Sequence, residues 1–146
     1  MTLSERSLVL LAALAVWFGL DFVGAPGLVS REALVSPAGA MMAALAIIAI
    51  LGVMRVRLSA ALFLAALALW AALQIETHWA TYLLVDASES KLRWYERVFG
   101  DNWRFLPLIA GRTTPDGYHA ILAGLILVNM VSALADCLRK ATSNVQ

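Results

Sequence analysis

Four apolar stretches divide the chain, and each is long enough to cross the hydrocarbon core of a membrane. They cover residues 7–23, 37–54, 58–75 and 118–138, and the third is able to continue to residue 85. A spanning helix needs about 20 residues, with a range of about 17–25. Backbone groups in lipid need partners within the chain, so only helices and closed barrels span a membrane. Since these stretches lack the alternation of barrel strands, the pattern predicts an all-α chain with four transmembrane helices.

Two of these helices carry recognisable start signals. Ser36 precedes Pro37, and Thr114 precedes Pro115. Each pair places a capping hydroxyl before a proline at the first helical position. Asp116 then adds negative charge to the first turn, where the helix dipole favours it. The two pairs therefore predict where the second and fourth helices begin.

Small residues predict where the helices touch. Membrane helices associate by close backbone approach, because lipid provides no hydrophobic drive between them. One side of the third helix is rich in alanine, and three further pairs have four-residue spacing. These positions are Ala61, Ala65, Ala68 and Ala72, and the pairs Ala15–Gly19, Gly39–Ala43 and Ala120–Gly124.

The long loop over residues 76–114 mixes aromatic residues with charges of both signs. Asp86 and Glu89 have the spacing of a capping box, and Gly100 is a typical helix end, so a helix is predicted over residues 87–99. Its apolar positions share one face, as in a helix that lies flat on a membrane surface. The loop is therefore predicted to form a short amphipathic helical cap. The rings expected at headgroup depth are Trp79, Tyr82, Trp94, Tyr95, Phe99 and Trp103.

Basic residues predict the orientation of this single membrane domain, residues 1–146. Arg55 and Arg57 lie between the second and third helices, Arg6 precedes the first, and Arg139 and Lys140 follow the fourth. Short cytoplasmic segments carry an excess of such residues. The expected arrangement is an antiparallel four-helix bundle in a bacterial inner membrane, with both termini cytoplasmic and the loop 76–114 extracytoplasmic.

The composition supports a membrane location and excludes several functions. Hydrophobic residues make up 62% of the chain and charged residues 14%, against about 25% charged in soluble domains. The net charge of +1 gives no electrostatic reason for nucleic-acid binding. The lone cysteine, Cys137, cannot form an internal disulfide or a paired-cysteine metal site.

Ionisable groups near the helix ends are the candidates for chemistry, because they are costly inside a membrane. Asp21, Glu76, His78 and His119 are predicted on the outer side. On a continuous helix Glu76 and His78 point about 200° apart. The candidate set is therefore His78 with His119, with Asp21 as a possible third member. Two such histidines can ligate a haem or a redox metal, or they can simply hydrogen-bond loop and lipid groups.

A polar stripe runs along the fourth helix, formed by Asn129, Ser132 and Asp136. Asn129 is expected near the middle of the membrane, where an unpaired amide is unfavourable. The stripe either bonds within the bundle or meets a partner helix. Both interpretations stay open from the sequence.

The function expected from these features is that of a non-catalytic accessory or scaffold subunit of a larger membrane complex. Its partners would be the lipid bilayer and other membrane subunits or further copies of itself. No nucleophile turn, P-loop or dinucleotide motif is present, and the sequence identifies no cofactor. One alternative is a haem- or metal-binding redox protein that uses His78 and His119. Another is a protein that binds or transports lipid or another apolar ligand, with the aromatic cap as its lid.

Overall fold

The computed structural model describes residues 2–25 and 38–143, which form helices and no strand. In chain order the helical segments are α1 (Glu5–Val23), α2 (Ala38–Val53), α3 (Ser59–Gln74), the π-helical turn η2 (Ile75–Trp79), α4 (Ala80–Leu83), α5 (Glu89–Phe99) and α6 (Gly117–Ser143). In this described part, three helices are long and apolar enough to cross a membrane: Glu5–Val23, Ser59–Leu83 and Gly117–Arg139. Helix α2 is apolar but has only 16 residues, so a fourth span stays a prediction.

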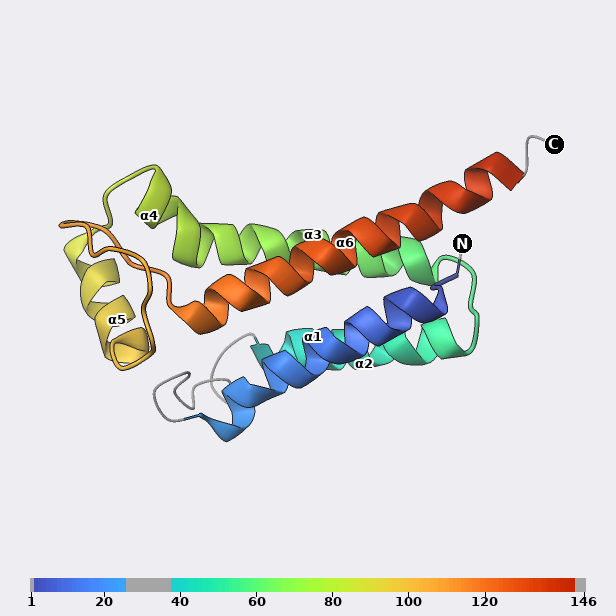
Figure 1. Cartoon of the computed structure of the whole chain (residues 1–146), viewed down its shortest axis with the longest axis horizontal. Helices are drawn as coiled ribbons and strands as arrows, with labels where there is room; N and C mark the ends of the chain where they lie inside the picture. The colour runs from blue at the N-terminus through green and yellow to red at the C-terminus, as the bar shows by residue number, and fades with distance from the viewer. Residues whose placement is uncertain (1, 26–37, 144–146) are drawn as a thin grey trace.

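The long helices lie side by side along the length of the molecule (Figure 1). Helix α6 contacts both α1 and α3, and α2 contacts the same two helices. The first turn of α1 and the last turn of α6 lie at one end of the molecule, and α5 lies at the other (Figure 1). This arrangement separates a termini end of the molecule from an α5 end.

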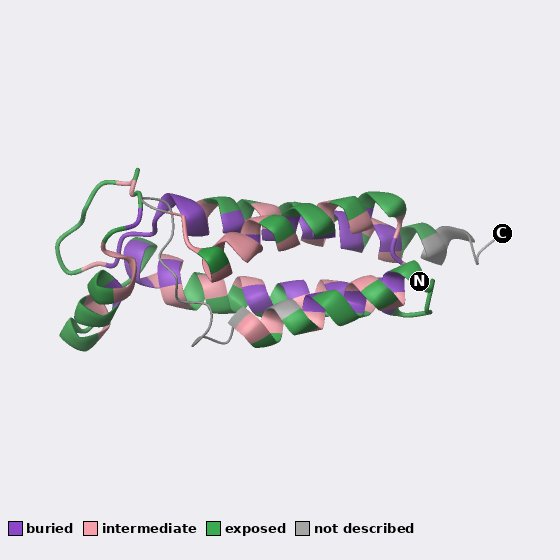
Figure 2. Ribbon diagram, turned by 90° about the horizontal axis from the view of Figure 1, so that it is seen from below, coloured by how far each residue is buried: buried purple, intermediate pink, exposed green. Residues whose placement is uncertain are grey.

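Large side chains from α1, α3 and α6 fill the space between these helices, while many apolar residues face outwards (Figure 2). Phe18 and Trp70 meet edge to face, with ring centroids 4.8 Å apart. The remaining core is mostly aliphatic. It includes Leu11, Leu14, Phe63, Leu67, Leu122 and Ile126. Because soluble proteins rarely expose large continuous apolar patches, the outward-facing side chains suit contact with lipid.

The contacts between helices that were predicted from small residues are wrong. Ala65, Ala68 and Ala72 are exposed on α3, and large side chains occupy the buried face of that helix instead. A Cβ atom added at Gly19, Gly39 or Gly124 would meet no atom of another described element within 4 Å. Bulky core residues keep the helix backbones apart, so no close approach requires these glycines.

The third helix takes the longer of its two predicted extents. Through η2 and α4 it runs without a break to Leu83, so residues 76–83 are helical and not part of the loop. In η2 the backbone N–H of Ala80 bonds to the carbonyl of Ile75, five residues earlier. Such wide turns change the direction of the side chains that follow.

The predicted caps of α5 and α6 are also corrected. The hydroxyl of Ser88 caps α5 by accepting from the backbone N–H of Lys91 at 3.3 Å. Asp86, the predicted cap, instead pairs with Arg112 at 3.3 Å. Helix α6 begins at Gly117, later than the Thr114–Pro115 signal predicted. The predicted pair Ser36–Pro37 lies outside the described residues.

The segment after α5 leads back into the protein. It has no helix between Phe99 and Gly117, and the backbone N–H of Ala87 bonds to the carbonyl of Gly111 at 2.8 Å to close the loop. Seven consecutive residues, 113–119, are then buried. The start of α6 therefore lies inside the α5 end of the molecule, beneath α5 and its connections.

Candidate functional site: a histidine pair beneath α5

The structure brings the two predicted histidines into direct contact. His78 comes from η2 and His119 from the first turn of α6. Their rings stack, with centroids 3.8 Å apart and planes 23° apart. His78 is 3% exposed and His119 is 6% exposed. The pair is therefore interior to the protein and not a set of side chains on a membrane surface.

Asp116 fixes the orientation of His119. Its carboxylate accepts from the backbone N–H of His119 at 2.9 Å, which makes Asp116 the N-cap of α6. Both carboxylate oxygens lie 2.9 Å from Nδ1 of the same residue. The side-chain amide of Asn102 donates to Oδ2 at 3.0 Å. Because a carboxylate only accepts, Nδ1 of His119 carries the proton.

This network keeps Asp116 ionised. Its side chain is fully buried, and burial alone would raise the pKa of Asp116. The hydrogen bonds from the side chain and backbone of His119, together with the hydrogen bond from Asn102, outweigh burial and lower the pKa. A buried carboxylate with three donors is stable where an unpaired one would not be.

Helix α5 holds His78 from the other side. Nδ1 of His78 lies 2.9 Å from the hydroxyl of Tyr95, which is 2% exposed. Burial raises the pKa of Tyr95 far above its ordinary value, so the phenol stays protonated. The ring of Phe99 contacts both imidazoles, with centroid distances of 5.2 Å to His78 and 4.9 Å to His119. Tyr95 and Phe99 thus cover the pair.

A cavity of about 260 Å³ lies beside the stacked rings. Both imidazoles line this cavity. Since each Nδ1 is hydrogen-bonded to Tyr95 or Asp116, Nε2 is the ring nitrogen that is left for a ligand. The cavity walls are otherwise mainly apolar and aromatic, and α5 provides part of the covering. Among the lining residues are Phe18, Asp21, Trp70, Gln74, Trp94, Val98, Phe99 and Leu122.

The pair does not fit a haem or a redox metal. The lone pair of each imidazole nitrogen lies in its ring plane, so two stacked rings direct their lone pairs within separate, nearly parallel planes and not at one ion. Two histidines on one haem iron need opposite faces of the macrocycle, whereas these rings touch. Both Nδ1 atoms are already hydrogen-bonded. In the described part of the chain no group of three or more His, Cys, Asp or Glu residues is placed to hold a metal.

Comparisons with protein-family models, curated proteins and solved structures found no match to this chain. Its function is therefore inferred from the geometry of its sites. The histidine pair, the Asp116 network and the cavity are the most developed of these.

The other candidate residues at this end have different surroundings. Asp21 lines the cavity, whereas Glu76 is exposed and pairs with Lys91 at 3.6 Å. Of the predicted cap rings, Trp94 and Trp103 are exposed and Trp79 is half-buried. Tyr82 is buried, and its hydroxyl donates to the Pro107 carbonyl at 3.3 Å. The depth of these rings in a membrane stays a prediction, but Tyr95 faces the histidines and not an outer surface.

The polar stripe of α6 faces α1. Asn129 is fully buried, and its side-chain amide donates to the carbonyls of Leu10 at 3.1 Å and Leu125 at 2.9 Å. The hydroxyl of Ser132 lies 2.8 Å from that of Ser7. The stripe therefore joins two helices of the same chain, which is the first of the two interpretations that the sequence left open.

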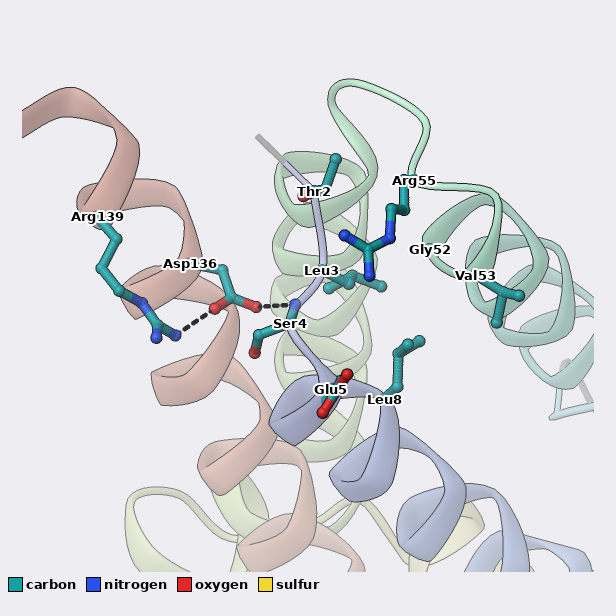
Figure 3. Close-up of a pocket in the computed structure, with 10 residues that line it drawn as sticks. All are labelled: Thr2, Leu3, Ser4, Glu5, Leu8, Gly52, Val53, Arg55, Asp136 and Arg139. Carbon is teal, nitrogen blue, oxygen red and sulfur yellow. Dashed lines mark hydrogen bonds and ion pairs between the residues drawn. The ribbon is translucent and has the colours of Figure 1, made fainter. Parts of the chain in front are cut away.

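Asp136 completes this junction at the termini end (Figure 3). It accepts from the backbone N–H of Ser4 at 2.8 Å and from the hydroxyl of Ser7 at 2.6 Å. Arg139 pairs with its other oxygen at 2.5 Å. Ser4 and Ser7 were not identified from the sequence, because an N-terminal serine before an apolar run is common and only the fold shows its partner.

Replacing Asn129 with leucine is expected to lower the free energy of unfolding by about 1 kcal/mol, the usual size of an interhelical hydrogen bond in membranes. The oligomeric state should not change, because the amide bonds within the chain. Thermal unfolding and native gel migration in mild detergent measure the two effects. Val131→Leu, an exposed change on the same helix, is the control. Altered migration with unchanged stability would instead place the stripe at a partner surface.

Proposed function

We propose that this chain is an integral membrane protein that binds a small amphipathic ligand in the cavity beneath α5. The proposal includes four antiparallel spans in a bacterial inner membrane, with α5 as a lid on the extracytoplasmic side. Three apolar helices of sufficient length support the membrane location. Arg55 and Arg139 lie at the termini end (Figure 3), which supports a cytoplasmic location of that end.

The observation that carries the proposal is a cavity with an oriented polar edge and apolar walls. Since Asp116 holds the proton of His119 on Nδ1, the neutral ring offers Nε2 as a hydrogen-bond acceptor. Phe18, Trp70 and Leu122 offer apolar surface in the same cavity. A few oriented polar groups among apolar walls are typical of ligand sites. The arrangement favours a ligand with a hydroxyl or amine donor on a compact apolar body.

The accessory-subunit function expected from the sequence has lost its main support. It depended on a polar stripe available to a partner, and Asn129, Ser132 and Asp136 bond to α1 instead. Membership of a larger complex stays a prediction. The alternative in which the aromatic cap is the lid of a ligand site gains support, because Tyr95 and Phe99 of α5 cover the histidine pair.

Small molecules that co-purify with the protein in mild detergent test the proposal by mass spectrometry. We expect one chemical class to be retained at about one molecule per chain. Val98 lines the cavity on α5, so Val98→Trp should fill the space and reduce retention at least tenfold. Val131→Trp adds the same ring on the exposed face of α6 and should leave retention unchanged. Equal retention by both variants, or no retained molecule, would contradict the proposal.

A further inference from the structure

A second site lies on a different face, where α6 and the end of the third helix form a groove. Its volume is about 400 Å³, and its walls come from η2 and α4 on one side and α6 on the other. These two sides diverge towards the α5 end (Figure 1). The walls are almost wholly apolar, with Ile75, Leu83, Ile126 and Met130 among them. Gln74 is the one described residue that lines both this groove and the histidine cavity. The site goes beyond the proposed function.

Two residues that line this groove each carry a buried polar atom without a partner. The atoms are Nε1 of Trp79, a donor, and Oε1 of Gln74, an acceptor, and neither has a hydrogen bond among the described residues. Buried polar atoms are nearly always hydrogen-bonded, because an unpaired one carries the full penalty of desolvation. Lipid chains offer no replacement for water. A partner from outside the chain would satisfy both atoms.

The π-helical turn explains why the two side chains meet in one groove. On a regular α-helix, residues five apart point about 140° away from each other. The wider turn of η2 lies between Gln74 and Trp79 and brings both residues to the groove. Single π turns of this kind are frequent at functional sites.

We propose that the groove binds one neutral glycerolipid with a free hydroxyl, of the diacylglycerol class. An ester carbonyl accepts from Nε1 of Trp79, and the hydroxyl donates to Oε1 of Gln74. The acyl chains then lie along Ile126, Leu127 and Met130.

Three features select this occupant. The described lining residues carry no charge, so a charged headgroup would be desolvated without compensation. Trp79 lies four residues before the end of the Ser59–Leu83 span, near the depth at which tryptophans meet ester groups. The groove opens outwards between two spanning helices, with Leu83 59% and Leu127 60% exposed, so lipid has direct access.

Native mass spectrometry from nanodiscs of phosphatidylcholine with dilute diacylglycerol tests the site. The wild type should retain diacylglycerol in preference to phosphatidylcholine. Trp79→Phe and Gln74→Leu should each weaken this retention about fivefold, the factor that corresponds to about 1 kcal/mol for one hydrogen bond. Ala123→Phe, which fills the groove, should abolish it. Trp103→Phe changes a tryptophan away from the groove and should have no effect.

The outcomes separate this site from the histidine cavity. Val98→Trp should leave diacylglycerol retention intact, even if the ligand of the cavity is lost or was never present. Equal retention of the two lipids, or unchanged retention in Trp79→Phe and Gln74→Leu, would overturn the inference. A lipid-free dimer that Trp79→Phe dissociates would also overturn it and assign the groove to a second copy of the chain.

Discussion

Replacing Asp116 with alanine is expected to lower the free energy of unfolding by about 3 kcal/mol. The change removes the N-cap of α6, for which about 1 kcal/mol is typical. It also removes the carboxylate that accepts from Nδ1 of His119 and from the amide of Asn102, and a lost acceptor of this kind costs about 1–3 kcal/mol. Thermal unfolding in mild detergent measures the loss. Asp101→Ala, an exposed acidic change in the same segment, should have almost no effect, and an equal loss in both variants would contradict the role of Asp116.

The pH dependence of stability gives a second test of the same residue. Because the pKa of Asp116 is lower in the folded protein, its ionised form stabilises the fold above the ordinary aspartate pKa of about 3.9. That contribution is lost as the pH falls through the lower, folded pKa. Asp116→Asn cannot ionise, so the wild type should be the more stable protein at neutral pH. The difference should shrink below about pH 4, and a constant difference across this range would contradict the argument.

The second large effect is expected from His119→Phe, which should reduce ligand retention at least tenfold. The phenyl ring preserves the stacking on His78 and the contact with Phe99, but it has no Nε2 atom. The free energy of unfolding should fall by only about 1–2 kcal/mol, because Asp116 keeps its hydrogen bonds to Asn102 and to the α6 backbone.

Tyr95→Phe is the matched control for that change. It removes the hydroxyl bonded to His78 at 2.9 Å, and Tyr95 is not among the described residues that line the cavity. Retention should stay within about twofold of the wild type, since a lost neutral hydrogen bond behind the site costs about 0.5–1.5 kcal/mol of stability and no ligand contact. A greater loss of ligand retention in Tyr95→Phe than in His119→Phe would indicate that the ligand depends on α5 and not on Nε2 of His119.

The sequence predicted three helices of spanning length because lipid imposes a length and a uniform polarity on such helices. The fourth span stays a prediction. The sequence also placed His78 near His119, because the predicted topology puts the end of the third helix and the start of the fourth on the same side of the membrane. The π turn could not be predicted, because no residue pattern specifies it. That turn determines where Gln74 and Trp79 point, and so the existence of the groove.

The predictions of helix caps and of contacts between helices failed for a different reason. Several residues before α5 and α6 have capping side chains, and only tertiary contacts decide among them. Asp86 pairs with Arg112 and leaves Ser88 as the cap. Alanine-rich faces match a packing motif by chance, whereas the actual contacts between helices depend on large residues such as Phe63. The buried role of Tyr95 likewise depends on where α5 docks, which an amphipathic pattern does not specify.

The most direct test of the account is ¹⁵N NMR of the histidine rings in lipid nanodiscs, because the chain contains only two histidines. The account predicts a through-space contact between the rings of His78 and His119, with the proton of His119 on Nδ1. It also predicts that the Nε2 signal of His119 shifts when bound small molecules are removed, and that Val98→Trp reproduces the shifted position. Rings without mutual contact, or an Nε2 signal that is the same in the loaded, stripped and Val98→Trp proteins, would contradict a ligand site beneath α5.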